Sequence, residues 1–130
     1  MIDGDTIEIH GQRLRLHGLD APESRQTCTT AAGEKWRCGQ VAAFALADRI
    51  GSAPIACDVL DVDRYQRQIV RCRDGAGEDI NRWLVASGHA VAYRRYSVDY
   101  AADEDMAREA GHGIWAGDFV MPAQWRRGTR

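Results

Sequence analysis

The stretch Thr6–His17, TIEIHGQRLRLH, contains two short segments in which apolar and polar residues alternate. Alternation with a period of two is typical of β-strands that bury one face. The residues between the segments, His10-Gly11-Gln12, favour a tight turn because glycine tolerates unusual backbone angles. The stretch therefore predicts a β-hairpin close to the start of the sequence.

The remaining sequence predicts three helices and three further strands. Helices are expected over residues 34–50, 79–87 and 97–109, strands over 54–62, 67–73 and 89–93, and a loop over 23–33. Hairpins with helices outside them favour an α+β fold over alternating βαβ units. We therefore expect a five-stranded OB-fold β-barrel with about three packed helices.

Two details of these helices are open to a direct structural check. The apolar positions of the first helix define the face that is expected to be buried: Val41, Ala43, Phe44, Leu46, Ala47 and Ile50. Ser97 is the expected N-cap of the last helix, because serine side chains accept hydrogen bonds from free amides at helix starts.

Length and composition are those of one ordinary globular domain. The chain has 130 residues, with 45% hydrophobic and 28% charged residues, so we expect a single domain over residues 1–130. No apolar run approaches the roughly 18 residues of a membrane span, and we expect no membrane partner. Because a strand-like pattern begins directly at Ile2, we expect a first barrel strand upstream of it to be missing or shortened.

The charged residues argue against binding of nucleic acid by bulk positive charge. The formal net charge is −2 at pH 7, whereas binding to the phosphate backbone draws on many Lys and Arg contacts. Sixteen of the 17 basic residues are Arg, and Lys35 is the only Lys. Genomic base composition explains most of this excess, but a few arginines remain candidates for bidentate contacts with phosphate.

The four cysteines, Cys28, Cys38, Cys57 and Cys72, contain no CxxC spacing, which argues against a structural zinc site. An even number in a small domain predicts two disulfides and an oxidising compartment. Of the three pairings we favour Cys28–Cys38 and Cys57–Cys72, because the latter two lie symmetrically about the turn expected at residues 64–65. Four reduced thiols are the alternative.

Carboxylates are concentrated in two short segments, Asp3-Gly4-Asp5 and Asp20-Ala21-Pro22-Glu23. Each segment taken alone reads as an ordinary turn. If Asp5 and Asp20 meet at adjacent strand ends, however, a hard divalent cation would relieve their repulsion, and Ca²⁺ accepts carboxylate, carbonyl and water oxygens. Ala21 can contribute only its main-chain carbonyl. The predicted metal ligands are therefore Asp5, Asp20 and Ala21.

Arg15 and Arg67 would suit a phosphate that is placed on this cation. Two guanidinium groups stabilise the charge that gathers on phosphate oxygens in the transition state, and Glu23 would take a proton from the attacking water or position it. Surface salt bridges are the alternative for both arginines. Because Arg15 and Asp20 are five residues apart, they converge only if the strand bends or ends between them, and Gly18 is the expected place.

Several segments now form a recognisable series. They are Ile2–Thr6, Arg15–Glu23, Asp63–Arg67, Leu84–Gly88 and Gly113–Trp115. In this order the series resembles the staphylococcal nuclease (thermonuclease) family over nearly the whole chain. The resemblance implies an OB-fold barrel with packed helices and Ca²⁺-dependent cleavage of DNA and RNA that leaves 3′-phosphate ends.

The resemblance also implies the roles of individual residues. Asp5, Asp20 and the carbonyl of Ala21 match the family's metal ligands, Arg15 and Arg67 its phosphate-binding arginines, Glu23 its general base, Tyr65 a tyrosine near the nucleotide, and Asp3 an aspartate near the metal.

The sequence departs from the family pattern at a few places. Gln66 replaces a common glycine, and Ala21 replaces a threonine of the type enzyme. The acidic pI predicts weaker binding of long polyanions.

The leading hypothesis is thus a monomeric, secreted or periplasmic endonuclease acting on single- and double-stranded DNA and on RNA. The alternative is a catalytically weak or inactive OB-fold module that binds nucleic acid or protein. The segment Tyr93-Arg94-Arg95-Tyr96 would flank a nucleic-acid groove, although a solvated loop explains it equally well.

Overall fold

The computed structural model describes residues 3–51 and 53–129 of the chain. In sequence order the elements are β1 (Thr6–Ile9), β2 (Gln12–Leu16), β3 (Leu19–Asp20), β4 (Cys28–Thr29), β5 (Lys35–Trp36), α1 (Cys38–Ile50), β6 (Ala56–Val62), β7 (Gln68–Arg73), α2 (Ile80–Ala86), β8 (Val91–Ala92), α3 (Ala101–Ala110), the 3₁₀ turn η1 (Gly113–Ala116) and α4 (Pro122–Arg126). Strands and helices mix along the chain, as the α+β prediction requires.

The main sheet has the strand order β1-β2-β7-β6. The predicted hairpin is confirmed, since β1 and β2 are antiparallel, and β7 joins β2 in parallel and β6 in antiparallel orientation. Two small pairs, β3 with β8 and β4 with β5, lie outside this sheet. Among the described residues the sheet is therefore open and four-stranded, and the five-stranded barrel is not confirmed. The strand predicted upstream of Ile2 lies outside the described residues.

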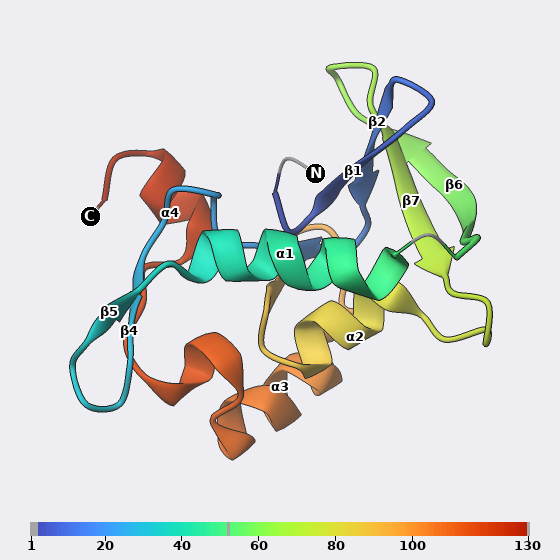
Figure 1. Ribbon diagram of the computed structural model, residues 1–130. Helices are drawn as coiled ribbons and strands as arrows, with labels where there is room; N and C mark the ends of the chain where they lie inside the picture. Colours follow the sequence, from blue (N-terminus) through green and yellow to red (C-terminus); the bar gives the residue numbers. More distant parts are fainter. Residues whose placement is uncertain (1–2, 52, 130) are drawn as a thin grey trace.

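Helix α1 crosses the middle of the molecule, with the main sheet at one end and α2 and α3 beneath it (Figure 1). Its buried residues are Cys38, Gly39, Ala42, Ala43 and Leu46. The predicted face is wrong at Val41 and Phe44, whose side chains are 41% and 61% exposed. The physical reason is that the disulfide from Cys38 to Cys28 and the close packing of Gly39 on Glu23 turn this side of the first turn inward.

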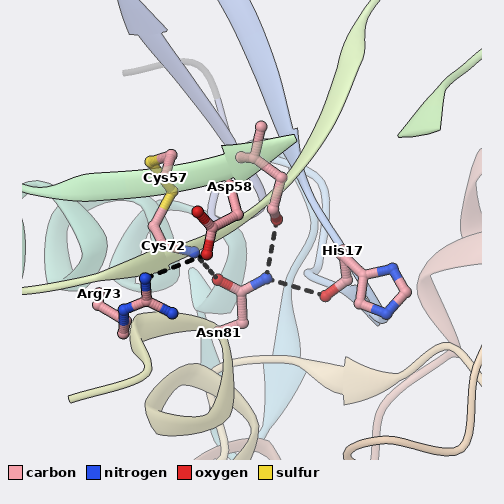
Figure 2. The surroundings of a disulfide bond; sticks show 7 residues. His17, Cys57, Asp58, Cys72, Arg73 and Asn81 are labelled. Carbon is pink, nitrogen blue, oxygen red and sulfur yellow. Dashed lines mark hydrogen bonds and ion pairs between the residues drawn. A yellow bond between two sulfur atoms is a disulfide. The ribbon is translucent and has the colours of Figure 1, made fainter. Parts of the chain in front are cut away.

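Both expected disulfides are present, Cys28–Cys38 and Cys57–Cys72. Cys57 and Cys72 are paired across β6 and β7, and the buried amide of Asn81 lies beside this bridge (Figure 2). Asn81 accepts a hydrogen bond from the Cys72 amide at 3.1 Å and donates to the carbonyls of His17 and Val70. It thereby fixes α2 to β7 and to the residue that follows β2. The two disulfides are consistent with a location outside the cytoplasm.

Several local predictions need correction. Residues 34–37 are not helical, because Lys35 and Trp36 pair with Thr29 and Cys28 in a small hairpin that also shortens the predicted loop. The last predicted helix begins at Ala101, and Tyr100 is its N-cap. The hydroxyl of Ser97 instead accepts a hydrogen bond from the Asp99 amide at 3.1 Å, within the preceding turn. In the described part of the chain, no helix has the length and hydropathy of a membrane span.

Candidate active site

A cleft of about 750 Å³ opens beside β1, β2 and the β6–β7 turn. Its lining joins acidic, basic and aromatic residues from distant parts of the chain: Asp3, Asp5, Arg15, Glu23, Tyr65, Arg67, Tyr93, Tyr96 and Arg126. Asp20 and Ala21 are not among the lining residues, and they are 2% and 1% exposed. They lie behind the lining residues to which Asp20 is bonded.

Arg15 brings the two predicted metal-binding aspartates together. Its Nη1 lies 3.1 Å from Oδ2 of Asp5, and its Nη2 lies 3.5 Å from Oδ1 of Asp20. The contact with Asp5 follows from the hairpin register, in which Thr6 lies opposite Arg15. The arginine therefore holds both carboxylates against the sheet.

The strand ends between Arg15 and Asp20, which meets the condition that their spacing set for convergence. Strand β2 stops at Leu16, and Gly18 has a φ of +80°, a backbone conformation that favours glycine. A Cβ at Gly18 would also lie 2.9 Å from the ring of the buried Tyr100. This turn redirects the chain, so that Asp20 falls on the same side as Arg15.

Asp5 and Asp20 are both almost fully buried, and Asp5 is held on either oxygen. Its Oδ1 accepts a hydrogen bond from the Thr6 hydroxyl at 3.0 Å, and its Oδ2 accepts one from the Ala21 amide at 3.1 Å. Burial raises the pKa of Asp20, although the hydrogen bond from Arg126 opposes this effect. Burial likewise raises the pKa of Asp3 and of Glu23. Burial therefore disfavours the ionised form of Asp3, Asp20 and Glu23.

Glu23 is positioned by its main chain. Gly39, in the first turn of α1, packs so closely on Glu23 that a Cβ at Gly39 would overlap with the Glu23 carbonyl. The Glu23 amide donates a hydrogen bond to the side chain of the buried Gln26 at 3.2 Å. The Glu23 carboxylate accepts one from Arg126 at 2.6 Å. Helix α1 thus fixes where this carboxylate enters the cleft.

Arg67 lies across the cleft in a self-contained turn. Oδ1 of Asp63 accepts hydrogen bonds from the amides of Tyr65 and Arg67, and its Oδ2 accepts one from Nε of Arg67 at 2.8 Å. Although burial works against it, these bonds lower the pKa of Asp63. Gln66, at the place of the family's glycine, has a φ of +67°. Arg67 is therefore paired with Asp63, whereas Arg15 is paired with Asp5 and Asp20.

The charges around the acidic side of the cleft do not balance. Four carboxylates, those of Asp3, Asp5, Asp20 and Glu23, face the two guanidinium groups of Arg15 and Arg126. With all four carboxylates ionised, two negative charges remain, which is the charge that one divalent cation neutralises. Among the described residues no group of three His, Cys, Asp or Glu has the spacing of a metal site. A cation at this site would therefore be held by two carboxylates with main-chain and water oxygens. This donor set suits Ca²⁺ better than zinc.

Sequence reasoning missed two residues of this site. Asp63 had a usable signal, because an aspartate at the start of a turn commonly accepts hydrogen bonds from amides further along it. Arg126 lies in a tail for which no helix was predicted, and no local pattern connects it with Asp20, which lies 106 residues earlier.

Comparison with known proteins identifies related sequences. The model of the family described as "Staphylococcal nuclease homologue" matches residues 13–117. The succinoglycan biosynthesis protein ExoI of Rhizobium meliloti is 43% identical over 117 residues, which is 88% of this chain and 61% of that protein. Protein ParB of Escherichia coli is 34% identical over 98% of this chain and 76% of its own length. An uncharacterized endonuclease of Haemophilus influenzae is 31% identical over 96% of this chain and 68% of its own length.

Proposed function

The chain belongs to the staphylococcal nuclease family, and on this premise we propose that it is a Ca²⁺-dependent endonuclease of DNA and RNA with little sequence preference. The observation that carries the proposal is the buried Asp5–Arg15–Asp20 cluster at the edge of a cleft that also holds Glu23 and Arg67. The chain spans 61% of the length of the Rhizobium relative. Any activity that depends on the full length of such a relative is therefore also a proposal for this chain.

Asp5, Asp20 and the carbonyl of Ala21 would hold the cation. When bound, the cation supplies positive charge to a phosphate oxygen and so lowers the cost of charge development. Arg15 keeps both carboxylates in place. The uncompensated negative charge of the acidic cluster supports this assignment, because a divalent cation removes it.

Arg15 and Arg67 would bind the scissile phosphate from two sides. Arginine suits this task because its guanidinium presents several N–H donors in one plane. Asp63 orients the Arg67 side chain through Nε, and the terminal nitrogens of that guanidinium would donate to the phosphate. Stabilisation of developing charge by such groups commonly contributes more than any other effect to the rate of phosphoryl transfer.

Glu23 would accept the proton of the attacking water. Its raised pKa brings the carboxylate closer to the working pH of a general base. Water adds to phosphorus, the bond from phosphorus to the 5′ oxygen breaks, and the leaving oxygen takes up a proton. The products are a 3′-phosphate and a 5′-hydroxyl.

The aromatic side chains of the cleft suit a nucleotide substrate. Tyr65 and Tyr96 are 66% and 68% exposed, and the rings of Tyr93 and Tyr96 meet edge to face with centroids 5.1 Å apart. Exposed aromatic rings stack on bases without regard to sequence. Single-stranded DNA and RNA would therefore bind more readily than double-stranded DNA. The enzyme would be a monomer located outside the cytoplasm.

The second candidate is a binding module that cleaves weakly or not at all. The double hydrogen bond from Arg126 to Asp20 favours it, because this pairing occupies a carboxylate that the cation needs. The name of the Rhizobium relative also refers to succinoglycan biosynthesis and not to cleavage. Tight oligonucleotide binding without turnover would favour this candidate.

The test is cleavage of labelled single-stranded DNA, double-stranded DNA and RNA with Ca²⁺, followed by addition of EGTA. We expect cleavage that stops with the chelator, and fragments that polymerase extends only after phosphatase treatment. Asp5→Asn is the matched variant, since it keeps the size of the side chain and removes its charge. No chelator-sensitive cleavage by a folded wild-type protein would overturn the proposal.

A further inference from the structure

Arg126, the last residue of helix α4, donates hydrogen bonds into the acidic cluster. Its Nη1 and Nη2 contact Oδ1 and Oδ2 of Asp20 at 3.0 and 2.8 Å, and Nη1 also contacts Glu23 at 2.6 Å. These contacts raise the pKa of Arg126, with the Asp20 hydrogen bond as the largest cause. The residue lies beyond the span that the family model matches, which ends at residue 117.

The segment that carries Arg126 is anchored along its length. The Asp118 carbonyl accepts a hydrogen bond from the Thr29 amide at 2.8 Å, and the Val120 carbonyl accepts one from the buried Gln26 side chain at 2.6 Å. Phe119 packs edge to face on Trp115 beside the Cys28–Cys38 bridge. In Figure 1 this C-terminal segment returns to the N-terminal part of the chain. The position of Arg126 is therefore set by tertiary contacts and not by a loose tail.

Gln26 connects this anchor with the active-site loop. It is fully buried, its Oε1 accepts the hydrogen bond from the Glu23 amide, and its Nε2 donates to Val120. The same side chain thus holds the main chain of Glu23 and the segment that delivers Arg126. Gln26 therefore supports both partners of the contact between Arg126 and Glu23.

Arg126 competes with a cation for Asp20, because its guanidinium donates to both oxygens of that carboxylate. Arg15 is the deeper of the two arginines, with a side chain 17% exposed, whereas that of Arg126 is 38% exposed and reaches the cleft surface. Arg15 also holds Asp5, whereas the described contacts of Arg126 are with Asp20 and Glu23. The more exposed guanidinium is the one that can leave without breaking the pair of aspartates.

We propose that Arg126 is a displaceable latch, a guanidinium that occupies Asp20 and Glu23 and that the cation must displace in order to bind. This proposal rests on the function proposed above, because it takes Asp5 and Asp20 as cation ligands. Displacement costs the charge-assisted hydrogen bonds of Arg126, so the latch weakens cation binding and stabilises the cation-free protein. Displacement of Arg126 also releases Glu23, so that Glu23 acts on water only when the cation is bound.

The experiment is Ca²⁺ titration calorimetry of the wild-type protein, Arg126→Gln and Arg127→Gln. Arg127 is the matched control, because it is the next residue, is exposed, and forms no ion pair within the described part of the chain. We expect Arg126→Gln to bind Ca²⁺ about tenfold more tightly than wild type, the effect of losing one charge-assisted contact. Arg127→Gln should stay within about twofold of wild type.

Thermal melting gives a second readout that does not depend on activity. Without Ca²⁺ the Tm of Arg126→Gln should fall below that of Arg127→Gln, and with saturating Ca²⁺ the two should agree. If Arg126→Gln does not fold without Ca²⁺, Arg126→Lys keeps the charge but loses the double hydrogen bond, and its affinity should lie between wild type and the level expected for Gln.

Each outcome has one reading. Equal Ca²⁺ affinities of Arg126→Gln and Arg127→Gln overturn the latch and leave the nuclease proposal intact. Tighter binding by Arg126→Gln in a protein that cleaves nothing supports the latch and overturns the nuclease. Absence of Ca²⁺ binding in every variant overturns both.

Discussion

The two sides of the cleft are built on different principles. The acidic side combines residues 5, 15, 20, 23 and 126, which come from the turn before β1, from β2, β3, the following loop and α4, and its two central aspartates are buried. The opposite side is one turn, Asp63–Arg67, in which a single carboxylate holds both an amide and the guanidinium of Arg67. One side depends on the whole fold, whereas the other depends on five consecutive residues.

This difference separates the expected effects of mutation. A change on the turn side should alter the reaction and leave cation binding and stability nearly unchanged. A change on the acidic side should alter cation binding, stability and its dependence on pH together, because desolvation and charge are coupled there.

The largest effect should come from Arg67→Ala. We expect the cleavage rate to fall about a thousandfold, a loss typical of removing a group that stabilises transition-state charge. Tm and Ca²⁺ affinity should change little, because the ion pair that Arg67 forms among the described residues lies within its own turn. Arg73→Ala, on the strand that follows and paired with Asp58 away from the cleft, is the control for kinetics and melting. An unfolded Arg67→Ala would mean that its side chain is structural.

Glu23→Gln should have the next largest effect. Loss of a general base lowers the rate about a hundredfold, and single-turnover cleavage measures this step. Calcium should still bind, because the proposed ligands are Asp5, Asp20 and Ala21. Glu34→Gln, in the exposed β4–β5 loop, is the control. A loss of Ca²⁺ binding in Glu23→Gln would make Glu23 a ligand and contradict its assignment as a base.

The dependence of stability on pH distinguishes the acidic side further. Burial raises the pKa of Asp20 in the folded state, so its ionised form is less favourable there than in the unfolded chain. The contribution of this residue to stability is therefore present below its unfolded pKa and is lost as pH rises through its folded pKa.

Thermal melting of Asp20→Asn and of wild type from pH 4 to pH 8, without Ca²⁺, tests whether ionisation of Asp20 destabilises the fold. At neutral pH we expect the Tm of the variant to be higher by a few degrees, about 1 kcal/mol in a domain of this size. The difference should close on acidification, when Asp20 of the wild type is also neutral. A variant that is less stable than wild type at neutral pH would show that the ion pairs outweigh desolvation.

The smallest effect is expected for Gln66→Gly, on the turn side. A non-glycine residue at a φ of +67° is strained, and its replacement by glycine should stabilise the protein by about 1 kcal/mol or less. Denaturant unfolding measures this change. Cleavage should stay within about twofold of wild type, since Asp63 and not Gln66 orients Arg67. A stability decrease would mean that the conformational entropy lost by glycine on folding outweighs the strain of Gln66.

The sequence predicted most reliably the features that depend on neighbouring residues. The β1–β2 hairpin follows from alternation around Gly11, and the Cys57–Cys72 bridge follows from symmetry about one turn. The break between Arg15 and Asp20 also has a local cause in Gly18. Because these features need only short-range information, a single sequence suffices to predict them.

Features that depend on distant contacts were predicted poorly. Val41 and Phe44 are exposed because a disulfide and the packing of Gly39 on Glu23 set the rotation of α1, which the apolar pattern alone does not reveal. Ser97 does not cap α3, since Tyr100 takes that position. Arg126 reaches Asp20 only through the anchoring of residues 118–120. Tertiary packing overrode the local signal at α1 and at Ser97, and for Arg126 there was no local signal.

The central claim is that the buried aspartates form one cation site that is independent of the arginine turn. The most direct measurement is Ca²⁺ titration calorimetry of wild type, Asp20→Asn and Arg67→Ala under the same conditions. We predict one bound Ca²⁺ with equal affinity for wild type and Arg67→Ala, and no measurable binding for Asp20→Asn. Binding of Ca²⁺ by a folded Asp20→Asn with the affinity of wild type would contradict the claim.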